Sequence, residues 1–342
     1  MFKKPEKNYK WDMRKIFGLL LLSLPSLLVA KEDDFSLNSS FSLWGQFIYM
    51  RRAETYSSDL VSTSKSFIET TSCGCKKKES TLCDAEGVAG RFNYEPGFRV
   101  GAKYMAKKSV WEVSYMSVAE WEASCHKDET GLLYFPGNAT FNLYDFQKAD
   151  SADVRYRTRL GDSELNYFRY LTGPRESYFT CCWLAGLRYS TIKEHLGISF
   201  TRSKATSSYT INAKNQIYGI QTGLGLQCNF TKRFFWDLIA KIGVGYDEIS
   251  QKTFLGDYNN TVMIRNYSKD GYSFPLILDG RIKIAYFLDD WVDLHVGYEF
   301  IYFNGIAEAP NQLVKKESQD RIVHASCAAI YYGLFAGMSI NF

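Results

Sequence analysis

Strict alternation of apolar with polar or small side chains, held over unusually long runs, is the feature that most limits how this chain can fold. Successive side chains of a β-strand point to opposite faces, so such a run predicts a strand with one apolar face. Strands in soluble sheets usually have ~5–6 residues. Four C-terminal segments hold the alternation for 12 to 17 residues, which is too long for an ordinary sandwich: 234–246, 272–288, 292–303 and 328–342.

The apolar faces of these runs are typical of a surface that meets lipid. Aromatic residues mark the ends of the runs and aliphatic residues fill their middles, as in 234–246. A membrane-crossing strand needs ~9–11 residues, so these runs are long enough to span and to project. Because lipid offers no partner to a sheet edge, the sheet must close. The predicted fold class is therefore all-β, a closed antiparallel transmembrane up-and-down β-barrel.

Weaker alternation upstream and the lengths of the connections give the topology. The connections are alternately short, such as 106–109 and 289–291, and long, such as 51–96, 191–214, 247–270 and 304–325. Outer-membrane barrels have short periplasmic turns and long extracellular loops. We therefore predict ten strands with both termini in the periplasm, or twelve if a long loop hides another hairpin. The six upstream strands are expected at 42–50, 97–105, 110–118, 153–171, 178–190 and 218–230.

The second face of the C-terminal runs is predicted to line the lumen. It carries charges of both signs, and rings of charge set ion selectivity in a pore. These residues are Asp237, Lys241, Asp279, Arg281, Lys283, Asp293, His295 and Glu299.

A three-residue turn at 289–291 fixes the expected register of the neighbouring strands. It pairs Leu288 with Val292 and Phe287 with Asp293. The same register places Arg281 opposite Glu299 inside the lumen, where a cross-strand pair of opposite charge is favourable.

The first 30 residues are typical of a secretory signal peptide. A basic segment precedes 15 apolar residues at 16–30, short of the ~20 that a spanning helix needs. We predict a cleaved signal at 1–30, with Met13 as an alternative start, a periplasmic segment at 31–38 and the barrel at 39–342. Without the six basic and two acidic residues of the signal, 35 of each kind remain. This balance gives no support to nucleic acid as a partner.

Eight cysteines in an exported chain indicate an oxidising compartment. Cys181 and Cys228 share the outward face near the periplasmic rim and could pair if their Cα atoms lie within ~7 Å. The loop cysteines could instead cross-link the barrel to other envelope proteins. No histidine or second C-x-x-C completes a tetrahedral set, so we predict no metal or cofactor. The candidate disulfide residues are Cys73, Cys75, Cys83, Cys125, Cys181 and Cys228.

The last strand and several internal segments resemble known proteins. Phe342, preceded by Ile340 and Met338, resembles the terminal strand read by the barrel assembly machinery of bacterial outer membranes. Taken in order, "LWGQFIYMRRAE", "PGFRVGAKY", "WEVSYMS", "YGIQTGLGLQCNF" and "FWDLIAKIGVGYD" resemble the legionella-type pore-forming outer-membrane proteins, also found in chlamydia-related bacteria. The resemblance implies a barrel of the envelope, thought to be a porin, often rich in cysteine and cross-linked. It supplies no catalytic residues.

Three functions follow as hypotheses. The first is a porin or envelope structural protein that allows small solutes or ions to diffuse, with outer-membrane lipid and the assembly machinery as partners. The second is a plugged structural or adhesin barrel cross-linked by disulfides, because small barrels are filled by side chains and ~16–18 strands leave a channel. The third and least favoured is an enzyme. His295 beside Asp293 is its best candidate, but no G-x-S-x-G or H-E-x-x-H motif occurs. We predict no catalytic activity.

Overall fold

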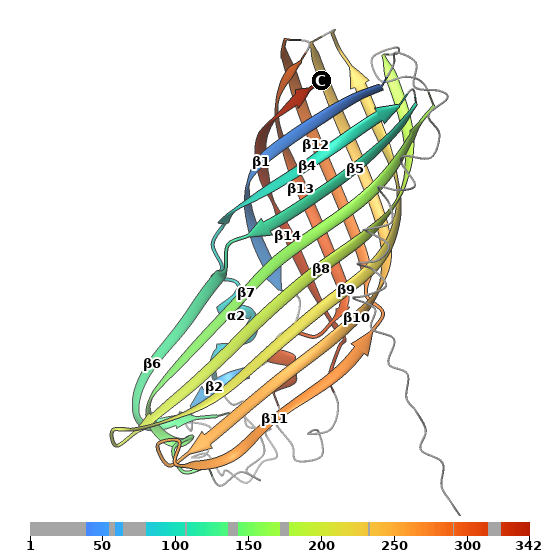
Figure 1. The fold of residues 1–342 in the computed structure, drawn as a ribbon. Coiled ribbons are helices and arrows are strands. Elements are labelled where there is room, and N and C mark those ends of the chain that lie inside the picture. The colour runs from blue at the N-terminus through green and yellow to red at the C-terminus, as the bar shows by residue number, and fades with distance from the viewer. Residues whose placement is uncertain are drawn as a thin grey trace, which may run out of the picture. The chain divides into compact units, whose positions relative to one another are not determined.

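The strands of the computed structural model close into one barrel (Figure 1). The predicted signal peptide and periplasmic segment, together with Cys73 and Cys75, lie outside the described residues. The structure describes residues 39–54, 59–63, 80–106, 108–135, 143–171, 178–231, 233–289, 291–313 and 323–342.

Ten antiparallel strands form the closed wall, which confirms the predicted fold class and strand count. Their order around the barrel is β1-β14-β13-β12-β10-β9-β8-β7-β5-β4, and β4 pairs with β1. The bounds are β1 Ser39–Glu54, β4 Glu95–Ala106, β5 Ser109–Val118, β7 Gln147–Tyr170, β8 Phe179–Arg202, β9 Ala205–Asn229, β10 Phe234–Asp257, β12 Leu276–Asp289, β13 Val292–Ile306 and β14 Cys327–Asn341.

Four further strands lengthen the sheet beyond the closed wall. β6 (Trp121–Tyr134) follows β5 along β7, and β11 (Val262–Ser273) pairs with β10 ahead of β12. β2 (Asp59–Thr63) pairs with β6 and with β3 (Ser80–Asp84). The helices among the described residues are short, α2 (Ala85–Ala89) and the 3-10 turn η3 (Pro310–Gln312). None of them is long and apolar enough to span a membrane.

Most of the residues predicted as long loops between β7 and β11 are paired strand instead. β7 to β10 have 24 or 25 residues each, against 10 to 16 for the other wall strands, and in Figure 1 they run on past the ends of those strands. β8 and β9 are joined only by Ser203 and Lys204, whose φ angles of 49° and 73° are those of a tight hairpin turn. The loops expected at 191–214 and 247–270 are therefore wrong in detail.

Two aromatic girdles border an apolar outer surface, as a membrane-spanning barrel requires. At one edge the rings of Tyr189 and Tyr218 lie 5.1 Å apart, and those of Tyr246 and Phe274 lie 5.9 Å apart. At the edge with the short turns, the rings of Phe230 and Phe234 lie 5.6 Å apart. Between the girdles many exposed side chains are aliphatic, including Ile220, Leu224, Ile242, Val244, Ile282 and Val296.

The alternation inverts beyond the girdle at Tyr189 and Tyr218. Further along β8, the buried inward side chains are apolar, such as Ile192 and Ile198, and the outward Lys193 is exposed. The environment outside the wall is therefore lipid before the girdle and water after it. The same alternate positions of the strand point inward on both sides of the girdle. Only the kinds of residue change, with apolar residues now inward and polar residues outward.

The last strand closes the barrel against the first, as predicted. Phe342 N–H donates to the Phe41 carbonyl at 2.7 Å, and β14 pairs with β1 from there to Glu54. Both ends of the wall therefore lie at the edge with the short turns. Arg281 lies opposite Glu299 and Phe287 opposite Asp293, as expected.

The expected pairing of Leu288 with Val292 is wrong. An irregularity after Phe287 shifts the register by one residue and brings Asp289 opposite Val292. The extra residue is accommodated beside the tight turn, where bulges commonly occur.

Candidate functional site

The eight residues predicted to line the lumen all lie on the inner side of the wall. Lys241, Asp279, Asp293, His295 and Glu299 are buried, whereas Asp237, Arg281 and Lys283 are partly buried around a cavity near the short turns. Their strands place them there by parity, because each inward residue follows an outward apolar one.

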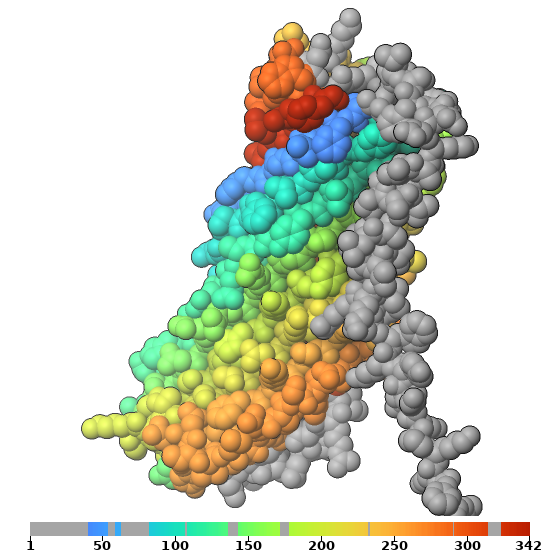
Figure 2. Space-filling view, viewed as in Figure 1, coloured from blue at the N-terminus to red at the C-terminus, as the bar shows by residue number. Residues whose placement is uncertain are grey.

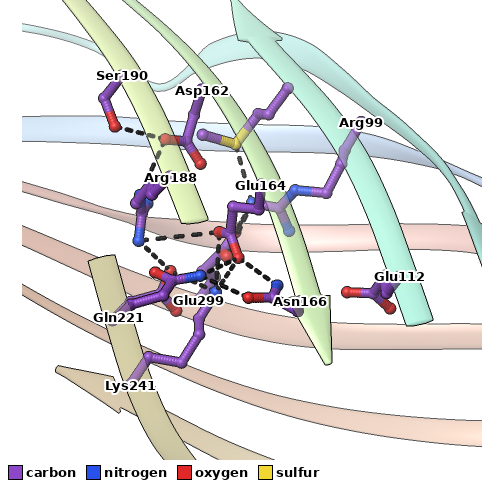
Figure 3. A network of polar contacts seen from close by, with 12 residues as sticks. Arg99, Glu112, Asp162, Glu164, Asn166, Arg188, Ser190, Gln221, Lys241 and Glu299 are labelled. Atoms are coloured by element: carbon purple, nitrogen blue, oxygen red, sulfur yellow. Dashed lines mark hydrogen bonds and ion pairs between the residues drawn. The ribbon is translucent and has the colours of Figure 1, made fainter. Parts of the chain in front are cut away.

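A group of charged side chains, which we call the lumen network, fills the middle of the barrel (Figure 3). Arg188 of β8 lies 2.9 Å from Asp162 of β7 and 2.9 Å from Asp279 of β12. Lys241 of β10 lies 2.7 Å from Glu164 of β7 and 2.9 Å from the same Asp279. The amides of Asn166 and Gln221 donate to Glu164 at 2.7 and 2.9 Å. Strands that are not neighbours are thus tied together through the interior.

A second part of the lumen network joins β4 to β13. Arg99 donates to both carboxylate oxygens of Glu299, at 2.8 and 2.6 Å, and both residues are buried. Arg99 also lies 2.9 Å from the sulfur of Met116 and 3.5 Å from Gln46. Because β1 and β14 lie between β4 and β13, this ion pair crosses the interior.

The end of the lumen beyond the girdle, which the extended sheet surrounds, is filled by an apolar core. Trp121, Tyr156, Phe303 and Tyr331 each expose 0% of their surface, and Phe92 exposes 1%. The indole N–H of Trp121 donates to the Met50 carbonyl at 3.0 Å, so even this polar atom is satisfied inside the core. Packing of this kind leaves little room for water.

One buried ion cluster lies within this core. Arg52 of β1 is 2.6 Å from Glu194 of β8 and 3.1 Å from Glu308. Along the wall, β1 and β8 are four strands apart on one side and six on the other, so this contact spans the barrel. Ala309 N–H and the Tyr156 hydroxyl also donate to Glu194, at 2.7 and 2.9 Å. Segment 307–313, which contains η3, is therefore held inside the lumen.

The surroundings of Glu308 stabilise its negative charge poorly. Burial, together with the nearby charge of Glu194, raises the pKa of Glu308 to about 8, although Arg52 opposes this shift. A single guanidinium thus faces two carboxyl groups. At neutral pH the protonated form of Glu308 is favoured.

The histidines do not form a converged catalytic group. His295 Nδ1 lies 3.0 Å from Asp293, as the sequence suggested, and Nε2 lies 3.1 Å from the Gln46 amide nitrogen. An amide nitrogen only donates, so Nε2 accepts and Nδ1 donates to Asp293. His126, bonded to Asp128 and Asp153, is exposed on β6. His195 bonds Asn212 on the outside of β8.

The interior cavity lies at the end with the short turns and has a volume of about 130 Å³. Lys283 and Asp237 form an ion pair of 2.8 Å on its wall. Lys103 lies on the opposite side, where it pairs with Glu112 at 2.9 Å. The residues that line the cavity lie near the short turns and include none of the buried cations of the lumen network, Arg99, Arg188 and Lys241.

The structure shows one disulfide in the described part of the chain, Cys83–Cys125, which joins β3 to β6. Cys181 and Cys228 are both free, so their suggested pairing is wrong. The register explains this, because Cys181 lies opposite Leu226 and Cys228 opposite Phe179. Diagonal neighbours in a sheet lie ~7–8 Å apart, beyond the reach of a disulfide.

Several lumen residues were missed by the sequence analysis. It named only the lining of the C-terminal strands, whereas more than half of the charged residues of the lumen network come from β4, β7 and β8. The alternation of side chains along β7 could have identified them, because in 154–168 the even positions are buried and the odd positions point outward. The missed residues are Arg52, Arg99, Glu112, Asp162, Glu164, Arg188 and Glu194.

The comparisons with known proteins find only distant likenesses. No protein-family model matches the sequence, and a search of curated proteins finds no match. Among solved structures, the chain is similar to the outer membrane protease OmpT from Escherichia coli, with 11% identity and a TM-score of 0.46 over 90% of this chain and 98% of that chain. It is also similar to the translocator domain of the autotransporter NalP from Neisseria meningitidis, with 9% identity and a TM-score of 0.32 over 96% of each chain.

A third likeness is to OprG from Pseudomonas aeruginosa, with 12% identity and a TM-score of 0.27 over 89% of this chain and 96% of that chain. With TM-scores below 0.5, none of these likenesses bears on what this barrel does. The resemblance to the legionella-type porins stays a prediction.

Proposed function

We propose that the chain is a structural barrel of the bacterial outer membrane whose lumen is closed to passive diffusion. The observation that carries this proposal is the filling of the interior. Arg99–Glu299 and Arg52–Glu194 cross the lumen, and an apolar core with Trp121 at 0% exposure occupies its extracellular end. A ten-stranded barrel is small enough for side chains to fill it.

The proposal includes an orientation and a set of partners. Both ends of the wall lie with the short turns, which we assign to the periplasm, and the extended sheet of β6 to β11 then projects outside the cell. Outer-membrane lipid surrounds the apolar band. The barrel assembly machinery would read the last strand through Phe342. Free cysteines would allow cross-links to other envelope proteins, of which the exposed Cys181 is the most accessible among the described residues.

Conductance across a planar lipid bilayer tests the closed barrel. We expect the refolded protein to give no steady conductance at neutral pH. The matched comparison is a variant lacking segment 307–313, in which the extracellular end of the lumen loses part of its filling. Steady channels from the unaltered protein would refute the closed barrel.

The porin hypothesis remains the second candidate, and the chemistry of the interior favours it. A lumen that only had to be filled would be at least as stable with apolar side chains as with buried ion pairs. The lumen network instead carries three cations, Arg99, Arg188 and Lys241, beside the carboxylates of Glu299, Asp162, Glu164 and Asp279. Such a lining would conduct ions if the network rearranged. Voltage-dependent channel openings would then appear in the same bilayer experiment.

We also propose that the chain is not an enzyme. His295, the buried histidine with an orienting carboxylate, presents its second nitrogen to the Gln46 amide and not to a hydroxyl or thiol nucleophile. A survey of peptide and ester substrates with purified protein, compared with a His295→Gln variant, tests this. Turnover that the variant abolishes would establish an enzyme.

A further inference from the structure

The interior cavity at the end with the short turns has two chemically different sides. One side is apolar, and its residues Val110, Phe168 and Cys182 form a small buried cluster on β5, β7 and β8. The other side carries the cations Arg281 and Lys283 of β12, which lies across the lumen from those three strands. A molecule that fills this cavity must therefore combine an apolar body with a polar group.

A row of cross-strand neighbours connects the two sides. Arg281 lies opposite Ile239 of β10, and Ile239 lies opposite Gly225 of β9. Gly225 lies opposite Cys182, and all four residues line the cavity. A Cβ atom at position 225 would lie 2.5 Å from the Cys182 sulfur, so glycine allows the thiol to lie flat against the wall. The space in front of the wall is left to the cavity.

The guanidinium of Arg281 points into this cavity without a direct partner. It forms no hydrogen bond and no ion pair with any residue that the structure describes, whereas Lys283 pairs with Asp237 at 2.8 Å. Glu112, the acid that Arg281 attracts from a distance, is already paired with Lys103 at 2.9 Å. Arg281 therefore keeps its five N–H donors available to whatever occupies the cavity.

The remaining acid of the cavity wall has partners of its own. Asp293 accepts hydrogen bonds from His295 Nδ1 at 3.0 Å and from the Ser339 hydroxyl at 3.1 Å. A guanidinium on the inner side of the wall is costly unless water or a ligand bonds its donors. The group that matches its planar fork best is a carboxylate or a phosphate, and an apolar wall beside it favours the organic acid.

The size and position of the cavity limit what can enter it. Its volume is about 130 Å³, and an apolar cavity of ~150 Å³ holds one benzene molecule. Ser40 and Asn341, at the two ends of the wall, line it and are partly exposed. The outer surface of β1, β4, β5 and β7, blue to green in Figure 2, is a continuous layer of side chains. Entry is therefore from the end with the short turns and not between these strands.

We propose that this cavity is a binding site for a small organic carboxylate whose apolar body has about the size of a benzene ring. The two carboxylate oxygens accept hydrogen bonds from the Arg281 guanidinium. The apolar body lies against Ile239, Cys182 and Phe168. The site is independent of whether the lumen conducts, because it needs access from one end only.

Fluorine NMR of 4-fluorobenzoate tests the site, with the folded barrel in a neutral detergent at neutral pH. We expect saturable binding to the wild-type protein. Benzoate should compete about tenfold better than benzamide, its uncharged analogue of the same shape, because a hydrogen bond to a charged partner typically contributes at least this factor. For the same reason, Arg281→Gln should raise the dissociation constant about tenfold or more.

Arg233→Gln is the matched control, because Arg233 is exposed near the short turns and does not line the cavity. It should change the dissociation constant less than about twofold. Heat-modifiable migration in gels verifies that both variants fold. Equal competition by benzoate and benzamide, or unchanged binding by Arg281→Gln, would overturn the proposal. Competition by inorganic phosphate as strong as that by benzoate would overturn it in favour of a site for free anions, and a lack of saturable binding would assign the cavity to water.

Discussion

The Nη2 nitrogen of Arg99 donates to both carboxylate oxygens of Glu299, at 2.8 and 2.6 Å, although their strands β4 and β13 are separated by β1 and β14. The pair is therefore a tie through the lumen and not a contact between neighbours. The charged atoms of both side chains are buried away from water, so each charge is stabilised mainly by its partner.

Removing Arg99 alone should be costly. Arg99→Met leaves the Glu299 carboxylate buried without its cation, and we expect a loss of about 3–5 kcal/mol in the free energy of unfolding. The double variant Arg99→Met/Glu299→Gln removes both charges and should recover most of this loss. Urea unfolding in micelles, followed by tryptophan fluorescence, measures both. The exposed Arg169→Met is the control. A single variant as stable as wild type would contradict the interpretation.

Deleting Phe342 should impair insertion and leave the folded barrel's properties otherwise unchanged. Its backbone exchanges hydrogen bonds with Phe41 at 2.7 and 3.3 Å, and its ring lies 6.4 Å from that of Phe41. We expect a smaller fraction of folded, heat-modifiable protein in outer membranes. Leu334→Ala, on the lipid-facing side of the same strand, is the control for simple loss of apolar surface. Equal insertion of the deletion and wild type would show that Phe342 is dispensable.

Breaking the Cys83–Cys125 disulfide should loosen the end of the barrel beyond the girdle at Tyr189 and Tyr218. The bond closes a segment with a sequence separation of 42, and a loop of that length corresponds to about 4 kcal/mol in the chain-entropy account. Cys125→Ser should therefore make β3 and β6 accessible to limited proteolysis while the wall remains intact. The same treatment of Cys181→Ser, which removes a free thiol, provides the baseline. Unchanged digestion of Cys125→Ser would mean that packing alone holds these strands.

Stability should depend on pH through Glu308. Its pKa of about 8 lies above the usual value of 4.5. Between these values the folded chain therefore holds a proton that the unfolded chain releases. Folding takes up a proton in this window, and the free energy of unfolding falls as pH rises from about 5 to about 8.

The variant Glu308→Gln isolates this contribution. The groups that face Glu308 are Arg52, Glu194 and the Cys327 thiol, and all of them remain in the variant. We expect its unfolding midpoint in urea to change less between pH 5 and 8 than that of wild type. An equally steep dependence in both proteins would assign the effect to other groups.

The sequence by itself determined the wall. Runs such as 292–303 and 328–342 alternate over lengths that only a membrane-spanning strand needs, so the ten strands and the closing role of Phe342 could be predicted. The inward direction of the Glu299 side chain could also be predicted, because the alternation of side chains between the two faces is a local property of a strand. The strand extensions at 191–214 were not predicted. At the girdle the apolar residues move from the outward face of the strand to its inward face, and in the sequence this change resembles the end of the alternating pattern.

Only the tertiary structure decided what fills the lumen. Arg281 lies opposite Glu299 in register, yet Glu299 bonds Arg99 from across the barrel. Partners such as Arg52 and Glu194 are 142 residues apart in sequence and meet only because the wall closes. A pattern along one strand specifies which side chains point inward. The curvature of the closed sheet decides how far they must reach and which of them touch, and that is a property of all ten strands together.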